Sequence, residues 1–424
     1  MSEKNTEDFP AESPGFDLQL HDDPEDLEKV WDYEPGGHHP VHLGDRLGEG
    51  KYKVIHKLGN GGFGNVWLCQ ILDPTPKYVA LKILMADLSG DDCKELKVNK
   101  LAEKIDNDSI CLPLDQFKVK GPNGDHWCFV YPLAGPMISS AIRTFEGDER
   151  ILRRLALRTV KTLAALHDIG VCHGDFTPHN VLLRMTGLDG LSEEEVIKIL
   201  HKPVTADVTT YSGKPLPESA ARYLVYPISF ISVDRQYFTD QIYIIDFGES
   251  FNESDPPDKL GTPKSYCSPE LLLGEKPSIA SDLWALGCTL YGIRTGEKLF
   301  NMFDDEADEY IYYMVLMLGV LPEPWWSTTW KDRRKWFKDE PDSEGRAVQV
   351  PDLNDKMAIE DRLGGGDVLR ELPDGRLVQA WDPGLPEEEK KIFIDLLRKL
   401  FRFKPEERLS TKEVQEHEWF KLGI

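Results

Sequence analysis

Short apolar runs mark the first third of the chain, whereas longer runs with helical spacing mark much of the remainder. The short runs are Tyr52-Lys53-Val54-Ile55, Val66-Trp67-Leu68-Cys69, Val79-Ala80-Leu81-Lys82 and Trp127-Cys128-Phe129-Val130-Tyr131. Runs of this length that are rich in β-branched and aromatic residues are typical of strands. We therefore predict a β-rich region over residues 52–132, in which the first two runs form a hairpin.

Helical spacing is clearest between Glu149 and Ile169, where apolar residues recur every three or four positions. They are Leu152, Leu155, Ala156, Val160, Leu163 and Leu166. This spacing predicts an amphipathic helix with one buried face. Further helices are predicted over Asp91 to Ile105, from Pro386, and from a capping box formed by Ser410 and Glu413.

A stretch that begins at Ser281 is apolar on nearly every side of a helix, so we expect it at the centre of a helical region. Asp282 in that helix needs polar partners, and backbone amides of the loop at residues 171–183 are expected to supply them. Glu270 is similarly predicted to form a buried pair with Arg408. Both contacts would be structural.

Polar stretches divide the chain into parts. Residues 1–30 are acidic and predict a flexible tail, and residues 31–51 predict an ordered lead-in. A β-rich part over 52–132 and a helical part over 133–424 follow. Two insertions are predicted in the helical part, at about 184–242 and 330–381, because these stretches are too long for simple connections.

The bulk composition narrows the class of protein. The chain has 424 residues, a formal net charge of −24 and 40% hydrophobic residues, as in an ordinary globular protein. No apolar run is long enough to cross a bilayer, and the acidic N-terminus predicts no secretory signal. The seven cysteines show no C-x-x-C pair, so we expect reduced core thiols in an intracellular protein.

The net charge and the histidines argue against two further kinds of site, one for nucleic acid and one for a metal. The acidic charge argues against binding a nucleic-acid backbone and favours basic partners, although a solvated acidic surface is the simpler interpretation. His38, His39 and His42 lie close together in a loop without a further Cys or His cluster. We interpret them as structural histidines and not as metal ligands.

A glycine-rich loop joins the first two predicted strands. In dinucleotide-binding folds such a loop opens a helix, whereas here a second strand follows, which disfavours that fold. Glycines let the backbone approach phosphates closely, and Phe63 at the tip is expected to cover them. The candidate phosphate-binding residues are Leu58, Gly59, Asn60, Gly61, Gly62, Phe63, Gly64, Asn65 and Val66.

Further candidates follow the glycine-rich loop. Lys82 closes the next strand, and Glu95, with Glu103 as the alternative, is expected to hold it. Asp175 and Asn180 share one loop between a helix and the apolar run Val181-Leu182-Leu183. Asp246-Phe247-Gly248 follows a short buried strand, Tyr243-Ile244-Ile245. In this order, the four pieces match the signature set of a protein kinase.

From about Tyr33 to its end, the chain resembles the eukaryotic protein kinases, and within them the SR-protein kinase (SRPK) subfamily, as a divergent member. Three features carry the second resemblance: the lead-in Gly36-Gly37-His38-His39-Pro40-Val41, the insertion before Asp246, and a small residue, Gly174, before Asp175. The resemblance implies an α+β bilobal fold with a β-rich N-lobe and an α-helical C-lobe that carries two insertions.

The resemblance also implies an ATP-dependent serine/threonine protein kinase that uses Mg²⁺. Asp175 would accept or orient the proton of the substrate hydroxyl, while Asn180 and Asp246 would hold the metal. Lys82, paired with Glu95, would contact the phosphates. Nucleotide binding would further involve Ala80 and the segment after the strand at 127–131, where Pro132 and Ala134 would pair with adenine.

Two positions depart from the usual kinase pattern. Thr177 replaces the lysine that supports the transferring phosphoryl group in most serine/threonine kinases, which removes one positive charge from the site. His179 would compensate only if protonated, and an ordinary loop histidine is the simpler interpretation. Gly174 replaces the arginine that pairs with a phosphorylated activation loop. We therefore expect activity without phosphorylation between residues 249 and 267.

The expected partners follow from the same resemblance. In SR-protein kinases an acidic groove docks Arg-rich substrates that include splicing factors, and Glu297 and Glu309 lie near the matching positions, in or near an acidic run. A solvated acidic loop is the alternative. We expect a monomer in the cytoplasm, the nucleus or both, without direct contact to nucleic acid or membrane.

Two other functions remain open. One is a nucleotide-binding pseudokinase or regulatory scaffold with little transfer activity, which Thr177 favours and which the intact Lys82, Asp175 and Asp246 disfavour. The other is a small-molecule kinase with the same fold, whose catalytic loop also lacks the lysine. The segment Ser268-Pro269-Glu270, where protein kinases have Ala-Pro-Glu, argues against this second alternative.

Overall fold

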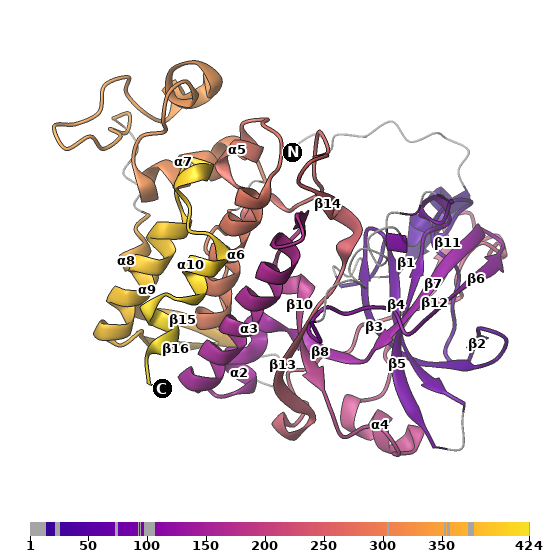
Figure 1. Ribbon diagram of the computed structural model, residues 1–424. Helices are drawn as coiled ribbons and strands as arrows, with labels where there is room; N and C mark the ends of the chain where they lie inside the picture. The colour runs from indigo at the N-terminus through magenta and orange to yellow at the C-terminus, as the bar shows by residue number, and fades with distance from the viewer. Residues whose placement is uncertain are drawn as a thin grey trace. The chain divides into compact units, whose positions relative to one another are not determined.

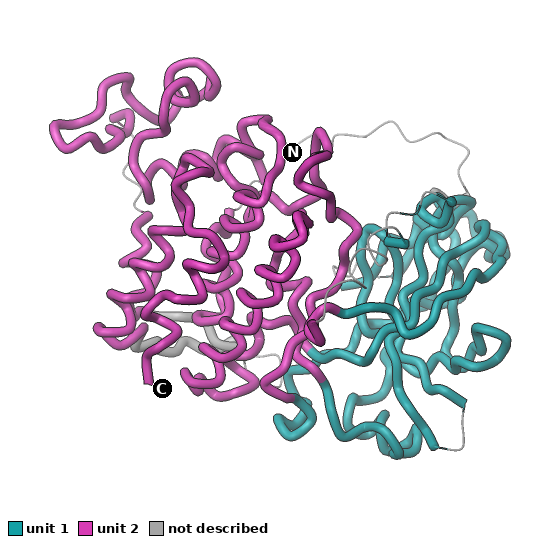
Figure 2. Tube along the Cα trace, viewed as in Figure 1, with its two compact units in different colours: residues 1–97, 111–135, 185–238 teal, residues 98–110, 136–184, 239–424 magenta. Residues whose placement is uncertain are grey.

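The computed structural model describes residues 14–21, 26–72, 75–91, 93, 95–96, 107–302, 305–351, 353, 357–371 and 377–423. The chain forms two compact units (Figure 2). Unit 1 comprises residues 1–97, 111–135 and 185–238, and unit 2 comprises residues 98–110, 136–184 and 239–424. The glycine-rich loop lies in unit 1, and the loop with Asp175 lies in unit 2.

Unit 1 is built on an antiparallel sheet with the strand order β2-β3-β4-β5-β7-β6 (Figure 1). The strands are β2 (Arg46–Leu47), β3 (Tyr52–Gly61), β4 (Gly64–Ile71), β5 (Lys77–Leu84), β6 (Asp115–Gly121) and β7 (Gly124–Pro132). β3 and β4 form the predicted hairpin. The predicted β-rich region is thus confirmed, and its buried side chains include Val54, Trp67 and Leu81.

A second sheet in unit 1 joins a strand of the N-terminal segment to two strands of the first insertion. Its order is β1-β11-β12, with β1 (Leu18–Leu20), β11 (Thr205–Thr210) and β12 (Tyr223–Val225). β1 pairs antiparallel with β11, so part of the predicted flexible tail is an ordered strand. The first insertion likewise belongs to unit 1 and not to the helical part of the chain, where we had predicted it.

Apolar packing explains this second sheet. The N-terminal segment and the first insertion share one hydrophobic cluster at this sheet. Its buried residues are Leu18, Leu27, Val30, Tyr33, Val208, Ala220, Ala221 and Leu224. Burial of these apolar side chains stabilises the second sheet although its strands are short. The insertion also carries α4 (Glu193–Leu200), which starts at a capping box on Ser192. Glu193 pairs with Lys53 of β3 at 2.6 Å.

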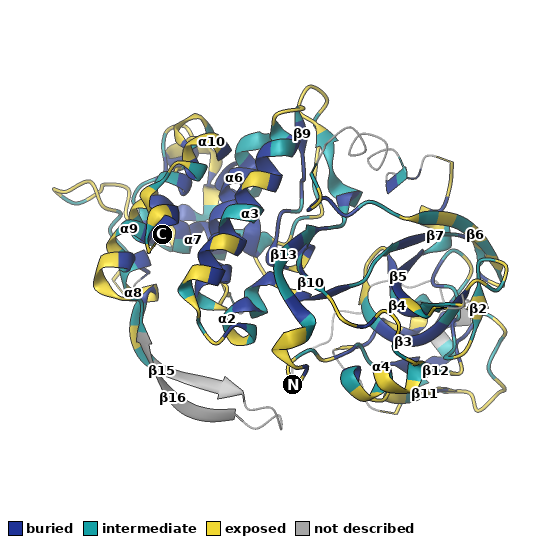
Figure 3. Ribbon diagram, turned by 60° about the horizontal axis from the view of Figure 1, so that its bottom comes forward, coloured by how far each residue is buried: buried dark blue, intermediate teal, exposed yellow. Residues whose placement is uncertain are grey.

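Unit 2 is mainly helical. Its longer helices are α3 (Glu149–His167), α6 (Ile279–Thr295), α7 (Ala307–Leu318) and α9 (Glu387–Leu400), and shorter ones are α2 (Ala141–Thr144), α5 (Pro269–Leu272), α8 (Ile359–Arg362) and α10 (Thr411–Gln415). The apolar face predicted for α3 is buried. α6 is buried on nearly every side, also as predicted (Figure 3). The capping box at Ser410 is present.

Short strands complete the fold. β9 (Val171–Cys172) pairs with β14 (Phe251–Asn252), and β15 (Gly364–Glu371) pairs with β16 (Leu377–Gly384). β10 (Val181–Met185) lies between β13 (Phe238–Ile244) and β8 (Ala134–Met137) in a three-stranded sheet. β9 and β10 border the loop that carries Asp175, so the paired strands fix both ends of that loop.

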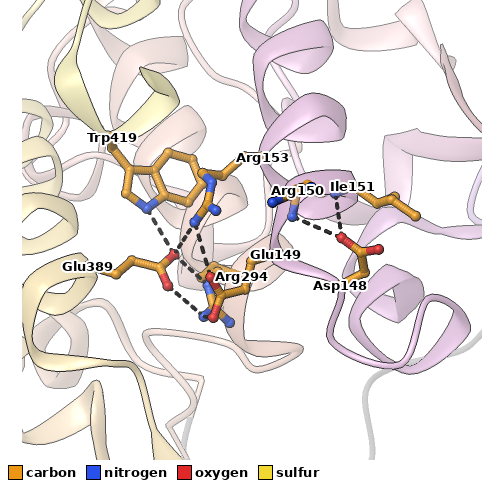
Figure 4. Close-up of polar contacts among 8 residues, drawn as sticks. All are labelled: Asp148, Glu149, Arg150, Ile151, Arg153, Arg294, Glu389 and Trp419. Carbon is orange, nitrogen blue, oxygen red and sulfur yellow. Dashed lines mark hydrogen bonds and ion pairs between the residues drawn. The ribbon is translucent and has the colours of Figure 1, made fainter. Parts of the chain in front are cut away.

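Two buried ion pairs lock the helices of unit 2. Glu389 of α9 accepts hydrogen bonds from Arg294 at 2.8 Å, from Arg153 at 3.2 Å and from the indole of Trp419 at 3.2 Å (Figure 4). The carboxylate thus links four separate segments. The second pair joins Glu270 to Arg408 through two contacts of 2.6 Å, which confirms the pair predicted from the sequence.

The described chain bears on two further sequence predictions. All seven cysteines are free and buried, and burial raises the pKa of Cys128 and of Cys267 to about 12. They are therefore unreactive thiols, as expected for core residues. Among the described residues, no helix combines the length and the apolar character that crossing a membrane requires.

Candidate active site

The glycine-rich loop is the tip of the β3–β4 hairpin in unit 1. Gly61 pairs with Gly64, and Asn60 pairs with Asn65 in the next register position. A side chain on Gly64 would lie 2.1 Å from the carbonyl oxygen of Ile83, so this position requires glycine. At Gly61 and Gly62 an added Cβ would meet no atom within 4 Å, which leaves space for a ligand to approach the backbone.

Lys82 forms the predicted ion pair with Glu95. Lys82 lies on β5, and its Nζ is 3.0 Å from Oε2 of Glu95. The hydroxyl of Tyr131 donates to the other carboxylate oxygen of Glu95 at 2.5 Å, which orients the acid. Lys82 and Glu95 are both nearly buried, so their attraction is weakly screened. Glu103 and most of the predicted helix over 91–105 lie outside the described residues.

The remaining nucleotide candidates of unit 1 lie on neighbouring strands. Ala80 pairs with Tyr131, and Val79 pairs with Pro132 at the end of β7. Ala134 is nearly buried and begins β8. Leu58 and Val66 lie on β3 and β4, and Phe63 at the loop tip is exposed. These placements are compatible with the adenine-binding role that the resemblance implies for this segment.

Asp282 holds the loop that carries Asp175 in unit 2. The carboxylate of Asp282 accepts the backbone N–H groups of His173 at 2.7 Å and of Gly174 at 3.0 Å. It also contacts the ring of His167 at 3.0 Å. These contacts confirm the prediction made for this buried acid. Because α6 is fully packed, the loop that carries Asp175 has a rigid base.

Asp175 and Asn180 lie together at the site. The side-chain amide nitrogen of Asn180 donates to Oδ2 and to the backbone oxygen of Asp175, both at 2.8 Å. The other carboxylate oxygen of Asp175, Oδ1, is buried and has no hydrogen-bond partner among the described residues. Burial raises the pKa of Asp175, the nearby charges of Asp246 and Glu249 add to this effect, and the Asn180 bond opposes it.

Asp246 has an unusual backbone. Its φ is +58°, in the left-handed region that few residues other than glycine adopt. It precedes the short 3-10 helix Phe247–Glu249, and the buried ring of Phe247 packs 5.1 Å from the ring of His173. Such strain is commonly found at functional sites, and here it accompanies the predicted metal ligand.

The donor set fits a magnesium ion. Asp246 offers a carboxylate, and Asn180 directs its amide nitrogen to Asp175, which leaves its amide oxygen as the donor for a cation. No group of three or more His, Cys, Asp or Glu residues in the described chain is arranged to hold a metal. Magnesium needs no such cage, because substrate phosphates and water complete its coordination. A cation here would also relieve the repulsion around Asp175.

The activation segment is fixed next to Gly174. Gly174 has a φ of +79°, and a Cβ on it would lie 2.3 Å from the carbonyl oxygen of Glu249. The carboxylate of Glu249 accepts the backbone N–H of Gly261 at 3.0 Å, and the hydroxyl of Thr262 donates to the carbonyl of Gly174. Glycine at 174 therefore reflects backbone geometry and does more than leave out an arginine.

The departure at Thr177 keeps its significance. Thr177 is buried, and no positive charge replaces the missing lysine at that position. Partial burial of the ring and, secondarily, the charge of Lys298 lower the pKa of His179. His179 is therefore mainly neutral at neutral pH, so it does not supply the missing charge.

The docking candidates lie in unit 2. Glu297 is exposed just after α6, and Glu309 lies in the first turn of α7. Oε2 of Glu309 is buried and lacks a hydrogen-bond partner in the described chain. Asp305, in the acidic run, binds Lys264 of the activation segment at 2.9 Å. Asp304 of the same run lies outside the described residues.

The side chains of Asn60 and Asn65, in the predicted phosphate-binding loop, bind the N-terminal segment of the chain. Asn60 donates to the backbone oxygen of Asp26 at 2.9 Å, and Asn65 donates to the carboxylate of Glu28 at 3.2 Å. Sequence reasoning missed Glu28 altogether. The available signal was Lys57, a charged residue next to the apolar residues Val54 and Ile55 on a strand that the structure buries, which would need a buried acid as partner.

A glycine-rich hairpin with a paired lysine is suited to bind phosphates. An acid beside an amide is suited to bind a metal and to accept a hydroxyl proton. Together they define an ATP-dependent phosphotransferase. The comparison with family models identifies which one: the protein kinase domain model matches residues 52–200 and 231–420. The chain belongs to the protein kinase family.

Individual relatives support this assignment. The chain is 26% identical over 396 residues to serine/threonine-protein kinase AFC3 of Arabidopsis thaliana, which covers 92% of this chain and 86% of the relative. It is 27% identical to serine/threonine-protein kinase SRPK of Physarum polycephalum, over 92% of this chain and 90% of the relative. The crystal structure of the PF14_0431 kinase domain matches 90% of this chain and 98% of that one with a TM-score of 0.56 and 21% identity, which confirms the fold.

Proposed function

We propose that this kinase transfers the γ-phosphoryl group of Mg-ATP to serine or threonine residues of basic proteins, including Arg-Ser-rich segments. The observation that carries the transfer reaction is a buried oxygen of Asp175, beside Asn180, that has no hydrogen-bond partner in the part of the chain that the structure describes. A buried acceptor without a partner is costly unless a ligand completes it. A substrate hydroxyl group is the ligand that the family resemblance implies.

Each catalytic residue has a defined task in this proposal. Asp175 accepts the proton of the substrate hydroxyl, and its Oδ2 bond to Asn180 keeps Oδ1 directed to that proton. Lys82, fixed by Glu95, binds phosphate oxygens, while backbone groups at Gly61 and Gly62 approach the phosphates closely. Asn180 and Asp246 hold magnesium, which when bound neutralises charge on the phosphates.

The preference for basic substrates rests on charge. The chain carries a net charge of −24, and Glu309 has a carboxylate oxygen that is buried without a partner in the described chain. An arginine of a substrate would satisfy this acceptor. The relative named SRPK supports the same substrate class.

Glu249 supports activity without phosphorylation of the activation segment. It already binds Gly261, and Thr262 binds Gly174, so the stretch Gly261–Thr262 of that segment is anchored to Glu249 and to the catalytic loop in the unmodified chain. A regulatory scaffold with little transfer remains the second candidate, because the neutral Thr177 and the mainly neutral His179 leave one charge missing.

The decisive experiment measures magnesium-dependent phosphate transfer to an Arg-Ser repeat peptide and to a generic basic protein. We expect the wild type to exceed the Asp175→Asn variant by about 10²-fold or more, since a positioned general base contributes that much. Preference for the Arg-Ser peptide should be lost with Glu309→Gln. If wild type and Asp175→Asn are equally inactive while Thr177→Lys gains activity, the scaffold function is correct.

A further inference from the structure

A buried acid in the stretch that the sequence predicted as a flexible tail links the N-terminal segment to the glycine-rich loop. The carboxylate of Glu28 forms an ion pair with Lys57, accepts the hydroxyl of Tyr33 at 2.7 Å and accepts the side-chain amide of Asn65 at 3.2 Å. Lys57 is 0% exposed and Glu28 is 7% exposed. We refer to residues 26–33, which carry this acid, as the strap.

The contacts of the strap flank the tip of the loop. Lys57 directly precedes Leu58 on β3, and Asn65 directly follows Gly64 on β4. Asn60 faces Asn65 across the hairpin and donates to the backbone oxygen of Asp26 at 2.9 Å. The strap therefore binds both strands of the hairpin at the residue pair next to the tip.

The first insertion supports the strap from the other side. Leu27, Val30 and Tyr33 of the strap pack in one cluster with Val208, Ala220, Ala221 and Leu224 of the insertion. The family model matches residues 52–200 and 231–420, so the strap and this part of the insertion both lie outside it. The segments that are additional to the kinase domain thus contact each other and the glycine-rich loop.

The energetic cost of burying charge indicates why the pair of Glu28 and Lys57 matters. Burying two charges is expensive and adds little net stability, so packed apolar residues would hold the strap at least as well. What the charges add is direction: the bonds of Glu28 fix Asn65 and Lys57 at defined positions. A loop rich in glycine has large conformational freedom, and fixing its base reduces the freedom that nucleotide binding must remove.

We propose that the strap positions the glycine-rich loop for nucleotide, with Glu28 as the positioning residue. In this proposal Glu28 acts on the nucleotide through Asn65 and Lys57, which it holds in place. The first insertion supports the strap, so it too sets the affinity for ATP. This inference rests on the proposed nucleotide binding of the loop.

The test separates positioning from stability. In the double variant Glu28→Met/Lys57→Met, both buried charges are replaced by apolar side chains of similar length. The thermal midpoint should fall only modestly, because only the neutral donors of Tyr33 and Asn65 lose their acceptor. The anchor of Asn65 is lost in this variant. If the competent fraction of the loop falls to about one tenth, the Kd and KM for Mg-ATP rise about tenfold while kcat changes little.

A matched control removes a hydrogen bond elsewhere in unit 1. The hydroxyl of Tyr78 donates to the backbone oxygen of Leu191 at 2.8 Å and has no contact with the strap, so Tyr78→Phe should keep the wild-type Kd. A double variant that folds and binds Mg-ATP like the wild type overturns the role of the strap alone. A wild type that binds no Mg-ATP overturns both the role of the strap and the proposed function.

Discussion

At the scale of single residues, Gly174 shows how one backbone angle shapes the site. The sequence marked it only as a replacement for arginine. Gly174 has a φ of +79°, and the carbonyl oxygen of Glu249 occupies the space that a Cβ would need. An arginine at this position would need a different path for the chain between Phe247 and Gly261. The loss of the arginine and the side-chain anchors of the activation segment therefore belong together.

This predicts a selective effect of a single methyl group. Gly174→Ala should lower both the thermal midpoint and the rate of phosphate transfer, because its Cβ would displace Glu249. Gly170→Ala is the matched control: its φ is +73°, but an added Cβ meets nothing within 4 Å. The control should lose only about 1 kcal/mol of stability, from backbone conformation, and keep its transfer rate. Equal transfer rates in the two variants would contradict the close contact.

At the scale of elements, the sequence predicted those parts whose signal is local. The hairpin over residues 52–71, the helix from Glu149 and the buried helix around Asp282 were all found from spacing and composition. Even the distant pair of Glu270 and Arg408 was predicted, because a buried acid needs a polar partner. β1 was missed, since a strand of three residues in an acidic segment becomes stable only when β11 pairs with it.

The helix α9 offers a prediction of its own. Glu389→Ala should lower the free energy of unfolding by about 3 kcal/mol, because the buried Arg294 and Arg153 lose their buried acid. Among the described residues, they would then keep only the partly exposed Glu149 as an acidic partner, at 3.6 and 3.5 Å. Chemical denaturation provides the measurement. Glu388→Ala, which removes an exposed acid from the same helical turn, should change stability by about 0.5 kcal/mol or less. Similar losses for the two variants would mean that the network in Figure 4 does not stabilise the helices.

At the scale of the whole molecule, the charged and titratable groups are distributed unevenly. Unit 1 buries several histidines, and burial lowers the pKa of His56 and of His39 to about 4, and that of His38 and His126 to a smaller degree. The sequence analysis interpreted only His38, His39 and His42 as structural histidines, and of these His38 is buried while the other two are half-buried. It had no means to locate Glu28 or the supporting insertion, because contacts between distant segments leave no local pattern.

These histidines make unit 1 sensitive to acid. Their pKa values are lower in the folded chain than the ordinary value of 6.5, so their contribution is complete above pH 6.5 and is lost as the pH falls toward 4. His56 alone should cost about 2 kcal/mol at pH 5 relative to neutral pH. Thermal midpoints at pH 7.5 and pH 5 should therefore differ less in His56→Gln than in the wild type. Parallel pH profiles would rule out this contribution.

The contact between the strap and the first insertion has a consequence for inheritance. Glu28 and Lys57 are each costly to bury alone, and the cluster around Leu27 and Leu224 requires both segments. A lineage cannot discard one segment without exposing apolar surface on the other. The two segments should therefore be gained and lost together among related kinases. In a kinase that lacks them, the residue corresponding to Lys57 should be uncharged or exposed to water.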